Sequence, residues 1–499
     1  MATIDQPTEK QLADYIFRGN TQSLCPKCLQ VVPAKIIVRD KRVYFKKKCG
    51  DCGEREDFVC SDVDYYDRLD FSVPAKVPLK HGVEPNKGCP YDCGLCTEHE
   101  QHTCVALVEL TSNCNLSCPM CFASSGPGGK NLSFEECKAA IDRIVEVEGR
   151  AEIIQLSGGE PTIHPEFLRI FEYAIGQNVD YININTNGIR FANDQELVDA
   201  VAQHRERVEI FFQFDGLNPE VTKSLRGEDI LATKLRAIDR LGDAGLNVTL
   251  AVTLQGGVND QEIGPIVDFA VARPWVTGIN FQPATYSGRH DAPEDLEQRI
   301  TFPDVMKAIA AQSEYGFQVD DFLPLPCAHP NCHIIGLAYR HDQTLTPINR
   351  FIETTENLDL LANGITFTRE NSIKLITELI DRRSCCSDGS CGSTGQALVA
   401  LENRKPPQPM EDSMSQMADR FLNHAISGQM GARDLFRITI TSFLDSYNFD
   451  LRRLMKCCTH HVLPSGHIIP FCAYNVLYRE GHAALPALTD AIRNETTQD

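Results

Sequence analysis

The chain has 499 residues, 42% of them hydrophobic, and a formal net charge of −20 at pH 7. Such a chain can bury a large core divided among two or three domains, and its acidity argues against a nucleic-acid backbone as the main partner. We find no N-terminal signal peptide and no apolar run long enough to span a bilayer, so we expect a cytoplasmic protein. The 21 cysteines occur in clusters, which in a cytoplasmic chain indicate metal sites and not disulfides.

The N-terminal segment, residues 1–80, contains two C-x2-C pairs separated by a basic, strand-like stretch. Its four cysteines are Cys25, Cys28, Cys49 and Cys52. Four thiolates at this spacing give a tetrahedral site for zinc or for a single iron, and the pattern does not distinguish the two metals. We therefore predict a small metal-binding ribbon.

A second cysteine-rich segment, residues 81–104, precedes the first predicted strand of the next domain. Its cysteines are Cys89, Cys93, Cys96 and Cys104. Together they can hold a complete auxiliary iron–sulfur cluster. The first three repeat the C-x3-C-x2-C spacing of the loop that follows, so only the surrounding sequence can decide which of the two loops binds a cofactor through an open iron.

That following loop carries Cys114, Cys118 and Cys121 directly after an apolar run, residues 105–110, which predicts a buried strand. Three thiolates can hold three irons of a [4Fe–4S] cluster and leave the fourth iron open. The carboxyl end of a strand is also where parallel α/β sheets and barrels bind ligands. The spacing resembles the signature of the radical S-adenosylmethionine (SAM) superfamily, in which SAM binds the open iron and is cleaved to a 5′-deoxyadenosyl radical that abstracts hydrogen.

A Gly-Gly-Glu element supports the same interpretation. A second strand, residues 152–156, runs into Gly158, Gly159 and Glu160. Paired glycines allow close approach of the backbone to a ligand, and a carboxylate beside them can accept a hydrogen bond from an ammonium group. Radical SAM enzymes bind the methionine amine of SAM at this place. A zinc knuckle or free buried thiols, the alternatives for the cysteine loop, would not require this element.

Four more strand-like runs follow, separated by amphipathic helical stretches. One helix is predicted to begin at Ser133, where Glu136 completes a capping box. Six strands alternating with helices imply parallel pairing with right-handed crossovers. We predict an α/β fold, a partial (β/α)6 TIM-like barrel over residues 105–325, with these further strands: 179–185, 208–214, 247–254 and 276–282.

Polar groups at the ends of these strands are candidates for contact with SAM. Asn185 lies in a Thr-Asn-Gly element, Asp215 precedes a glycine, and Arg226 lies in an Arg-Gly pair. Each is equally well explained as part of a turn or a helix cap. Similar elements contact SAM in radical SAM barrels, and we rank Asn185 ahead of Asp215 and Arg226.

The remaining region, residues 326–499, is predicted to be largely helical and to return its cysteines toward the metal sites. A further cluster would need four of the cysteines that follow the barrel to be brought together by folding. They are Cys327, Cys332, Cys385, Cys386, Cys391, Cys457, Cys458 and Cys472.

The cysteine-rich strings 87–104, 113–122, 325–332 and 457–475 resemble the archaeal tetraether lipid synthase family and its bacterial relatives, and the match covers most of the chain. The resemblance implies a SAM cluster, auxiliary [4Fe–4S] clusters and a rubredoxin-like iron. It places the SAM cluster on Cys114, Cys118 and Cys121, and the single metal on Cys25, Cys28, Cys49 and Cys52. It places one auxiliary cluster on Cys89, Cys93, Cys96 and Cys104, and a second on Cys327, Cys332, Cys472 and either Cys457 or Cys458. It leaves Cys385, Cys386 and Cys391 without a match.

The same resemblance implies that the protein joins two lipid tails through a new carbon–carbon bond, with a ferredoxin- or flavodoxin-type electron donor and peripheral contact with a membrane. Two alternative enzymes stay open. One methylates a reduced pterin of the 7,8-dihydro-6-hydroxymethylpterin type and would need a compact, polar pocket instead of a long apolar one. The other modifies a peptide and would need an N-terminal winged peptide-binding domain. A plain electron carrier would leave the Gly-Gly-Glu element unexplained.

Overall fold

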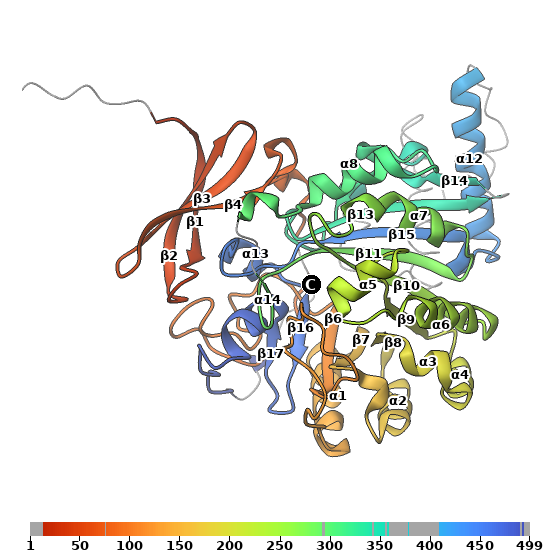
Figure 1. Ribbon diagram of the computed structural model, residues 1–499, viewed down its shortest axis with the longest axis horizontal. Coiled ribbons are helices and arrows are strands. Elements are labelled where there is room, and N and C mark those ends of the chain that lie inside the picture. The colour runs from red at the N-terminus through yellow and green to blue at the C-terminus, as the bar shows by residue number, and fades with distance from the viewer. Residues whose placement is uncertain are drawn as a thin grey trace, which may run out of the picture.

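An open, twelve-stranded sheet forms the centre of the computed structural model (Figure 1). A separate four-stranded sheet at the N-terminus lies beside it. The structure describes residues 13–74, 76–291, 295–341, 344–354, 357–358, 378, 409–489 and 492–493. The unmatched Cys385, Cys386 and Cys391 lie outside these described residues.

Six adjacent strands of the main sheet are parallel, as predicted, and each crosses over to the next through helical structure. The strands are β6 (Val105–Thr111), β7 (Ala151–Gly158), β8 (Val179–Thr186), β9 (Val208–Gln213), β10 (Asn247–Leu254) and β11 (Val276–Pro283). The sheet does not close on itself. The predicted α/β class and partial barrel are therefore confirmed.

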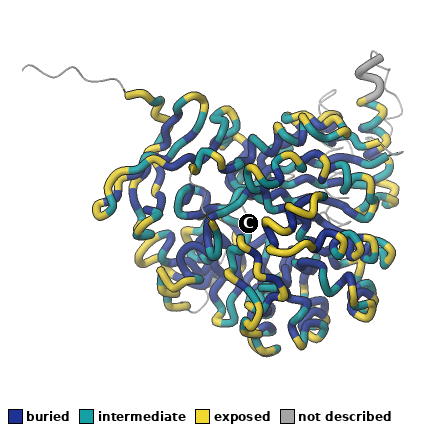
Figure 2. The backbone as a smooth tube through the Cα atoms, in the orientation of Figure 1, coloured by how far each residue is buried: buried dark blue, intermediate teal, exposed yellow. Residues whose placement is uncertain are grey.

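Helices cover the outer face of these strands (Figure 1). They are α1 (Phe134–Glu148), α2 (Phe167–Ile175), α3 (Ile189–Asn193), α4 (Gln195–Ala202), α5 (Pro219–Arg226), α6 (Leu231–Asp243), α7 (Ile263–Val271) and α8 (Phe302–Gln312). Helix α1 begins at the predicted capping box, with Ser133 and Glu136 each bonding the other's backbone N–H. Within the described residues, no helix has the length and hydropathy of a membrane span. Figure 2 shows the strands as mostly buried and the outer surface of the helices as exposed.

The C-terminal region extends the main sheet at both edges. At one edge β15 (Leu435–Thr441) pairs parallel with β11, and β13 (His333–His341) pairs antiparallel with β15. At the other edge β16 (Thr459–Val462) pairs parallel with β6. The shorter outer strands are β12 (Leu323–Pro324), β14 (Thr344–Pro347) and β17 (Ile468–Pro470).

This arrangement adds strands to the helices that were expected in the C-terminal region. The described helices there are α12 (Pro409–Ile426), α13 (Leu451–Met455), α14 (Phe471–Ala473) and a π-helical turn, Tyr474–Tyr478. The sequence of β15 alternates between buried and half-buried positions and includes β-branched residues, which is the pattern of a strand. Among the described residues, β15 and β16 join this region to the two edges of the barrel sheet.

The N-terminal sheet is an antiparallel ribbon of β1 (Ile16–Leu24), β2 (Val31–Arg39), β3 (Arg42–Cys49) and β4 (Gly53–Cys60). It is tied to the C-terminal region by buried polar contacts. The Lys47 ammonium lies 2.9 Å from Asp57 and donates to the backbone carbonyl of Tyr447 at 2.7 Å. Thr21 donates to Asp450 at 2.6 Å. Buried polar groups need such partners, so these contacts fix the ribbon against the loop that follows β15.

Candidate active site

The loop after β6 gathers Cys114, Cys118 and Cys121 into one cluster. Backbone hydrogen bonds hold the loop in place: Cys121 and Arg289 exchange N–H···O bonds of 2.8 and 3.0 Å, and Arg289 Nε donates to the carbonyl of Cys118 at 2.6 Å. All three thiols line one cavity. Three thiols grouped at the open end of a barrel, facing a cavity, fit the ligand set of a cluster with one open iron.

Gly158 and Gly159 are required by the close approach of the β7 end to this cysteine loop. A Cβ atom on Gly158 would lie 2.3 Å from the carbonyl oxygen of Thr111, and one on Gly159 would lie 2.2 Å from that of Asn113. Gly158 also has a φ of 138°, which side-chain-bearing residues rarely adopt. Both glycines line the cavity, so the strand end, the cysteine loop and the cavity meet at this point.

Glu160, predicted from the sequence to contact SAM, follows the two glycines in the structure. Its side chain is fully buried and does not line the cavity. The carboxylate accepts hydrogen bonds from Thr162 through both N and Oγ1, from Thr186 Oγ1 at 2.8 Å and from Asn187 N at 2.7 Å. The carboxylate therefore ties the ends of β7 and β8 together.

Arg226 and Asp215 act as a pair. Arg226 lines the cavity, and its guanidinium interacts with the Cys118 thiol. Asp215 lies outside the cavity lining and is fully buried. Burial by itself would raise the pKa of the Asp215 carboxyl, but Arg226 and the buried Lys234 outweigh that effect and hold the pKa below its ordinary value. Asp215 therefore remains charged and fixes the position of Arg226.

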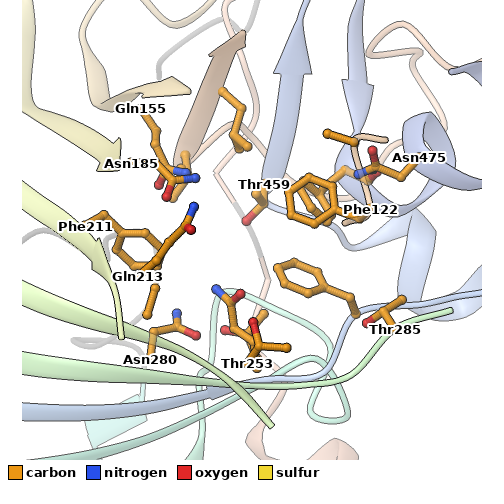
Figure 3. A pocket seen from close by; sticks show the side chains of 18 of the residues that line it. Phe122, Gln155, Asn185, Phe211, Gln213, Thr253, Asn280, Thr285, Thr459 and Asn475 are labelled. Carbon is orange, nitrogen blue, oxygen red and sulfur yellow. Dashed lines mark hydrogen bonds between the residues drawn. The ribbon is translucent and has the colours of Figure 1, made fainter. Parts of the chain in front are cut away.

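The cavity inside the barrel has a volume of about 260 Å³ (Figure 3). Its wall on the β7–β11 side carries amides at positions that point inward from the strands, including Asn185, whose Nδ2 donates to Ser157 at 3.1 Å. Strand register places two of the other amides opposite each other and two on either side of one intervening strand. Gln155 is the register partner of Asn183, and the small Ala251 is the partner of both Gln213 and Asn280.

The opposite side of the cavity is partly aromatic. Phe122, Phe443 and Phe471 all line it. The ring of Phe471 lies 5.2 Å from that of Phe122 and 4.4 Å from that of Phe443, measured between centroids. Figure 3 shows Phe122, with Thr459 and Asn475, across the cavity from Gln213 and Asn185. The cavity is thus lined by both aromatic rings and amides, with Phe211 beside Gln213 and Asn475 beside Phe122.

A second group of thiols reaches the same cavity through Cys458. The thiols of Cys104, Cys327 and Cys458 lie within 4.8 Å of one another, Cys332 packs against them, and Cys458 lines the cavity. His102 Nε2 lies 3.5 Å from the Cys104 thiol. This grouping differs from the predicted sets, which placed Cys104 in a different cluster from Cys327. The physical reason is the pairing of β16 with β6, which brings the backbone carbonyl of Cys458 within 2.9 Å of the Cys104 N–H.

Two further neighbourhoods contain cysteines. Hydrogen bonding with the Cys89 thiol, burial and the nearby Cys96 raise the pKa of Cys93, whereas Cys104 lies with Cys327 and Cys458. Burial, followed by the nearby Cys472 and Cys458 thiols, raises the pKa of Cys457. Arg453 donates to the thiol of Cys332 at 3.3 Å and also interacts with that of Cys472. Cys332 therefore lies between the group at Cys104 and the neighbourhood of Cys457 and Cys472.

The four cysteines of the N-terminal ribbon come together as the spacing predicts. The thiols of Cys25, Cys28, Cys49 and Cys52 all lie within 4.8 Å of one another. Two of them are buried and two are half-buried. A compact set of four thiols in a four-stranded ribbon fits one tetrahedral metal ion.

Asn185 and Gln213 were singled out from the sequence as polar groups at strand ends, but Gln155, Asn183 and Asn280 were not. Gln155, Asn183, Gln213 and Asn280 occur within runs that the sequence predicts as buried strands. Parallel strands covered by helices on both faces are normally apolar throughout, and closed barrels are filled by branched apolar side chains. Polar residues at alternate positions of such strands are therefore the sequence feature that could have predicted a binding cavity inside the barrel.

Two family models match the chain. Residues 108–270 match a model described as the radical SAM superfamily, and residues 17–61 match one described as the HMPTM N-terminal zinc ribbon domain. Fold, cysteine loop and cavity together define the chain as a radical SAM protein whose cofactors are SAM and a [4Fe–4S] cluster. The second match favours zinc at the N-terminal site.

The chain is similar to the 7,8-dihydro-6-hydroxymethylpterin dimethyltransferase of Methanocaldococcus jannaschii, with 31% identity over 492 residues that cover 92% of this chain and 94% of the relative. The chain belongs to the family of that protein. It is 32% identical over 151 residues to the mycofactocin maturase MftC of Mycolicibacterium smegmatis, which covers 30% of this chain and 37% of that relative. It also matches the structure of Streptococcus suis SuiB bound to S-adenosylmethionine, with a TM-score of 0.34, 13% identity and coverage of 42% and 46% of the two chains.

The superfamily prediction is therefore confirmed. The finer prediction of a lipid synthase is not supported, because the relative that covers nearly the whole chain is a pterin dimethyltransferase. The family supports the alternative of pterin methylation better than lipid coupling.

Proposed function

We propose that the protein methylates a reduced pterin by radical SAM chemistry. The observation that carries the proposal is the cavity inside the barrel, which is compact, has amides on one wall, and is lined by the three cysteines of the SAM loop. The family relationship to a 7,8-dihydro-6-hydroxymethylpterin dimethyltransferase supports the same substrate class.

The lining of the cavity suits a small bicyclic substrate. A pterin has a flat ring system, which can pack on aromatic side chains such as Phe122, and a polar edge, which can bond to amides such as Gln213. Two lipid tails would need a longer apolar channel.

Different residues of the chain have different roles at the site. Cys114, Cys118 and Cys121 would hold the cluster that, with SAM bound, supplies the 5′-deoxyadenosyl radical for hydrogen abstraction. Arg226, fixed by Asp215, keeps a positive charge beside the Cys118 thiol and at the cavity wall.

An auxiliary cluster on the Cys104 group would lie next to the substrate. Cys104, Cys327 and Cys458 are buried, and Cys458 lines the same cavity as the SAM loop. A redox centre beside the substrate is suited to exchange an electron with it. We therefore assign this group, rather than the one at Cys89, the closer role in substrate chemistry.

Anaerobic reconstitution with iron and sulfide, followed by incubation with SAM, dithionite and 7,8-dihydro-6-hydroxymethylpterin, tests the proposal. We expect 5′-deoxyadenosine together with a pterin that has gained one or more methyl groups, both read by mass spectrometry. A parallel incubation with total lipid extract provides the comparison. Lipids joined tail to tail, with the pterin unchanged, would overturn the proposal in favour of lipid coupling.

A further inference from the structure

The N-terminal ribbon and the loop that carries Cys89 border a groove on the surface of the protein. Its volume is about 1120 Å³, and it shares no lining residue with the cavity inside the barrel. Strands β2 and β3 supply residues on the ribbon side, and the segment 85–89 supplies residues on the other side. Helix α13, which packs against β1, contributes Leu451 and Met455. The groove is therefore a second concave site, separate from the proposed pterin cavity.

Lysine side chains line this groove from both sides. Lys35 and Lys48 on the ribbon and Lys87 on the loop are exposed. Lys48 lies 3.7 Å from Glu54, whereas neither Lys35 nor Lys87 forms an ion pair with another described residue. The carboxylates that line the groove belong to Glu54 and Glu98. The exposed lysines without a counter-ion therefore leave the groove with an excess of positive charge.

Two lysines of the groove face each other across the ribbon. Lys35 on β2 is the register partner of Lys46 on β3, and Lys46 lies 3.0 Å from Glu56. Like charges directly opposite each other destabilise a pair of strands. Lys47 and Arg452 also line the groove, but each is paired with a buried carboxylate. The stability of the ribbon therefore does not explain the exposed lysines, whereas a negatively charged partner would.

The Cys89 group, which comprises Cys89, Cys93 and Cys96, is the cysteine group next to this groove. Cys89 is half-buried and lines the groove, which no other described cysteine does. By contrast, the three grouped thiols at Cys104 are buried, and the cysteines of the SAM loop line the barrel cavity. An iron–sulfur cluster on the Cys89 group would therefore lie beside the groove, where an external partner can approach it.

Buried side chains connect the Cys89 group with the SAM loop. Cys93 and Phe471 belong to one cluster of buried residues, against which Phe122 packs. Phe122 directly follows Cys121 in the chain, and its ring lies 5.2 Å from that of Phe471. An electron that enters at the groove can therefore reach the SAM loop through the interior of the protein.

We propose that this groove is the docking site of a small acidic electron-carrier protein that reduces a cluster on the Cys89 group. Reductive cleavage of SAM consumes one electron, which the carrier supplies as its flavin or iron–sulfur centre is oxidised. The electron enters the cluster beside the groove and passes to the cluster of the SAM loop. The inference goes beyond the proposed function, because SAM must be reduced whichever substrate is methylated.

Charge complementarity explains why the groove is basic in an acidic protein. The chain has a formal net charge of −20, so it repels an acidic carrier at a distance. A local excess of positive charge steers such a partner to one face and increases the association rate, most strongly at low salt. A membrane with anionic lipids would also attract lysines, but a redox partner accounts in addition for the position of Cys89 in the same groove.

The double variant Lys35→Glu, Lys87→Glu tests the assignment, with flavodoxin as the probe and ferredoxin in a parallel series. We would measure binding of the oxidised carriers to the reconstituted protein by calorimetry, and reduction of its clusters by the reduced carriers by stopped-flow absorbance. Reversal of two charges should weaken binding and slow reduction about tenfold or more at low salt, and the difference should shrink at high salt. Reduction by dithionite, a small chemical reductant that needs no docking site, should not change.

Matched variants separate the position of a charge from its sign. Lys130 is also exposed, forms no ion pair with another described residue and lies outside the groove, so Lys130→Glu should react with both carriers as the wild type does. The double variant Lys35→Gln, Lys87→Gln removes the charges without reversing them and should have a smaller effect than charge reversal. Substitution of such exposed side chains changes stability little, so folding is preserved.

The variant Cys89→Ala tests the point of electron entry. The lysines remain in this variant, so the carriers should still bind, but reduction of the SAM cluster by the carriers should slow about tenfold or more. Iron analysis and electron paramagnetic resonance verify which cluster is lost. Reduction by the carriers at the wild-type rate would overturn the entry of electrons at the Cys89 group.

Binding and reduction that charge reversal leaves unchanged would overturn the docking site, as would failure of the wild type to bind either carrier. Equal slowing with dithionite would also overturn it, because it would show damage to the clusters. Vesicles of phosphatidylserine and phosphatidylcholine provide the last comparison. Wild-type binding to these vesicles that is lost on charge reversal, with both carriers unaffected, would assign the groove to a membrane instead. None of these outcomes depends on pterin binding, so the proposed function is tested separately.

Discussion

Arg226 donates to both carboxylate oxygens of Asp215, from Nε at 2.7 Å and from Nη2 at 2.5 Å, although Asp215 is fully buried and Arg226 is only 8% exposed. The backbone N–H of Thr253 donates to the same carboxylate at 3.1 Å. A buried charge pair with additional hydrogen bonds has a well-defined geometry. The pair therefore holds the guanidinium at the cavity wall beside Cys118.

The first prediction concerns this pair. Asp215→Asn leaves the Arg226 charge buried without its counter-charge, so we expect the free energy of unfolding to fall by about 3–5 kcal/mol. Glu220 and Lys223 form an exposed pair on α5, and Glu220→Gln should cost less than about 1 kcal/mol. Urea unfolding of both variants checks the difference. Equal losses would contradict a special role for the buried pair.

The second prediction concerns the SAM loop. Replacing Cys114, Cys118 and Cys121 with alanine should abolish reductive cleavage of SAM, because no open cluster iron would remain in this loop. Metal in the N-terminal ribbon should be retained. Production of 5′-deoxyadenosine and the zinc content measure the two effects. Cleavage that persists in the triple variant would assign SAM binding to the loop that carries Cys89.

The third prediction concerns Gly159. In Gly159→Ala the new Cβ would lie 2.2 Å from the backbone oxygen of Asn113, so the cysteine loop must shift. We expect a stability loss of about 1–3 kcal/mol, as for other overpacked sites, and strongly reduced SAM cleavage. At Gly19 a Cβ would meet nothing within 4 Å, so Gly19→Ala serves as the matched control. Full SAM cleavage in Gly159→Ala would show that the loop tolerates the shift.

The fourth prediction tests which cysteines share a cluster. If Cys104 and Cys327 hold one cluster, Cys104→Ala and Cys327→Ala should each lose the iron of that cluster, and the double variant should lose no more than either single variant. Cys89→Ala combined with Cys327→Ala should instead show additive iron loss, because the two residues lie in different groups. Iron analysis and electron paramagnetic resonance check both expectations. Additive loss in the Cys104 and Cys327 double variant would restore the grouping predicted from the sequence.

The fifth prediction concerns the ribbon metal. Cys25→Ser with Cys28→Ser removes two of four grouped thiols, so the ribbon should lose its metal ion and unfold locally, since ribbons of this kind depend on metal for folding. Zinc analysis and limited proteolysis of residues 13–61 report the two effects. Unchanged zinc content would place the metal elsewhere.

Local sequence determined the elements of this protein. The six parallel strands, the capping box at Ser133 and the two cysteine pairs of the ribbon all follow from short-range patterns, because periodicity, capping and metal-ligand spacing act over a few residues. The three cysteines of the SAM loop belong to the same class. Glu160 was placed correctly at the end of β7, but its direction toward Thr186 and Asn187 could not be read from the motif.

Only the tertiary structure decided which distant residues meet. Cys104 and Cys458 are far apart in the chain, and they share a site because β16 pairs with β6 at the edge of the sheet. The presence of Asn183 and Asn280 in one cavity likewise depends on how the strands pair, with Asn183 opposite Gln155 and Asn280 opposite Ala251. Periodicity shows that a residue lies on a buried strand, but long-range packing decides whether that strand faces a filled core or a cavity.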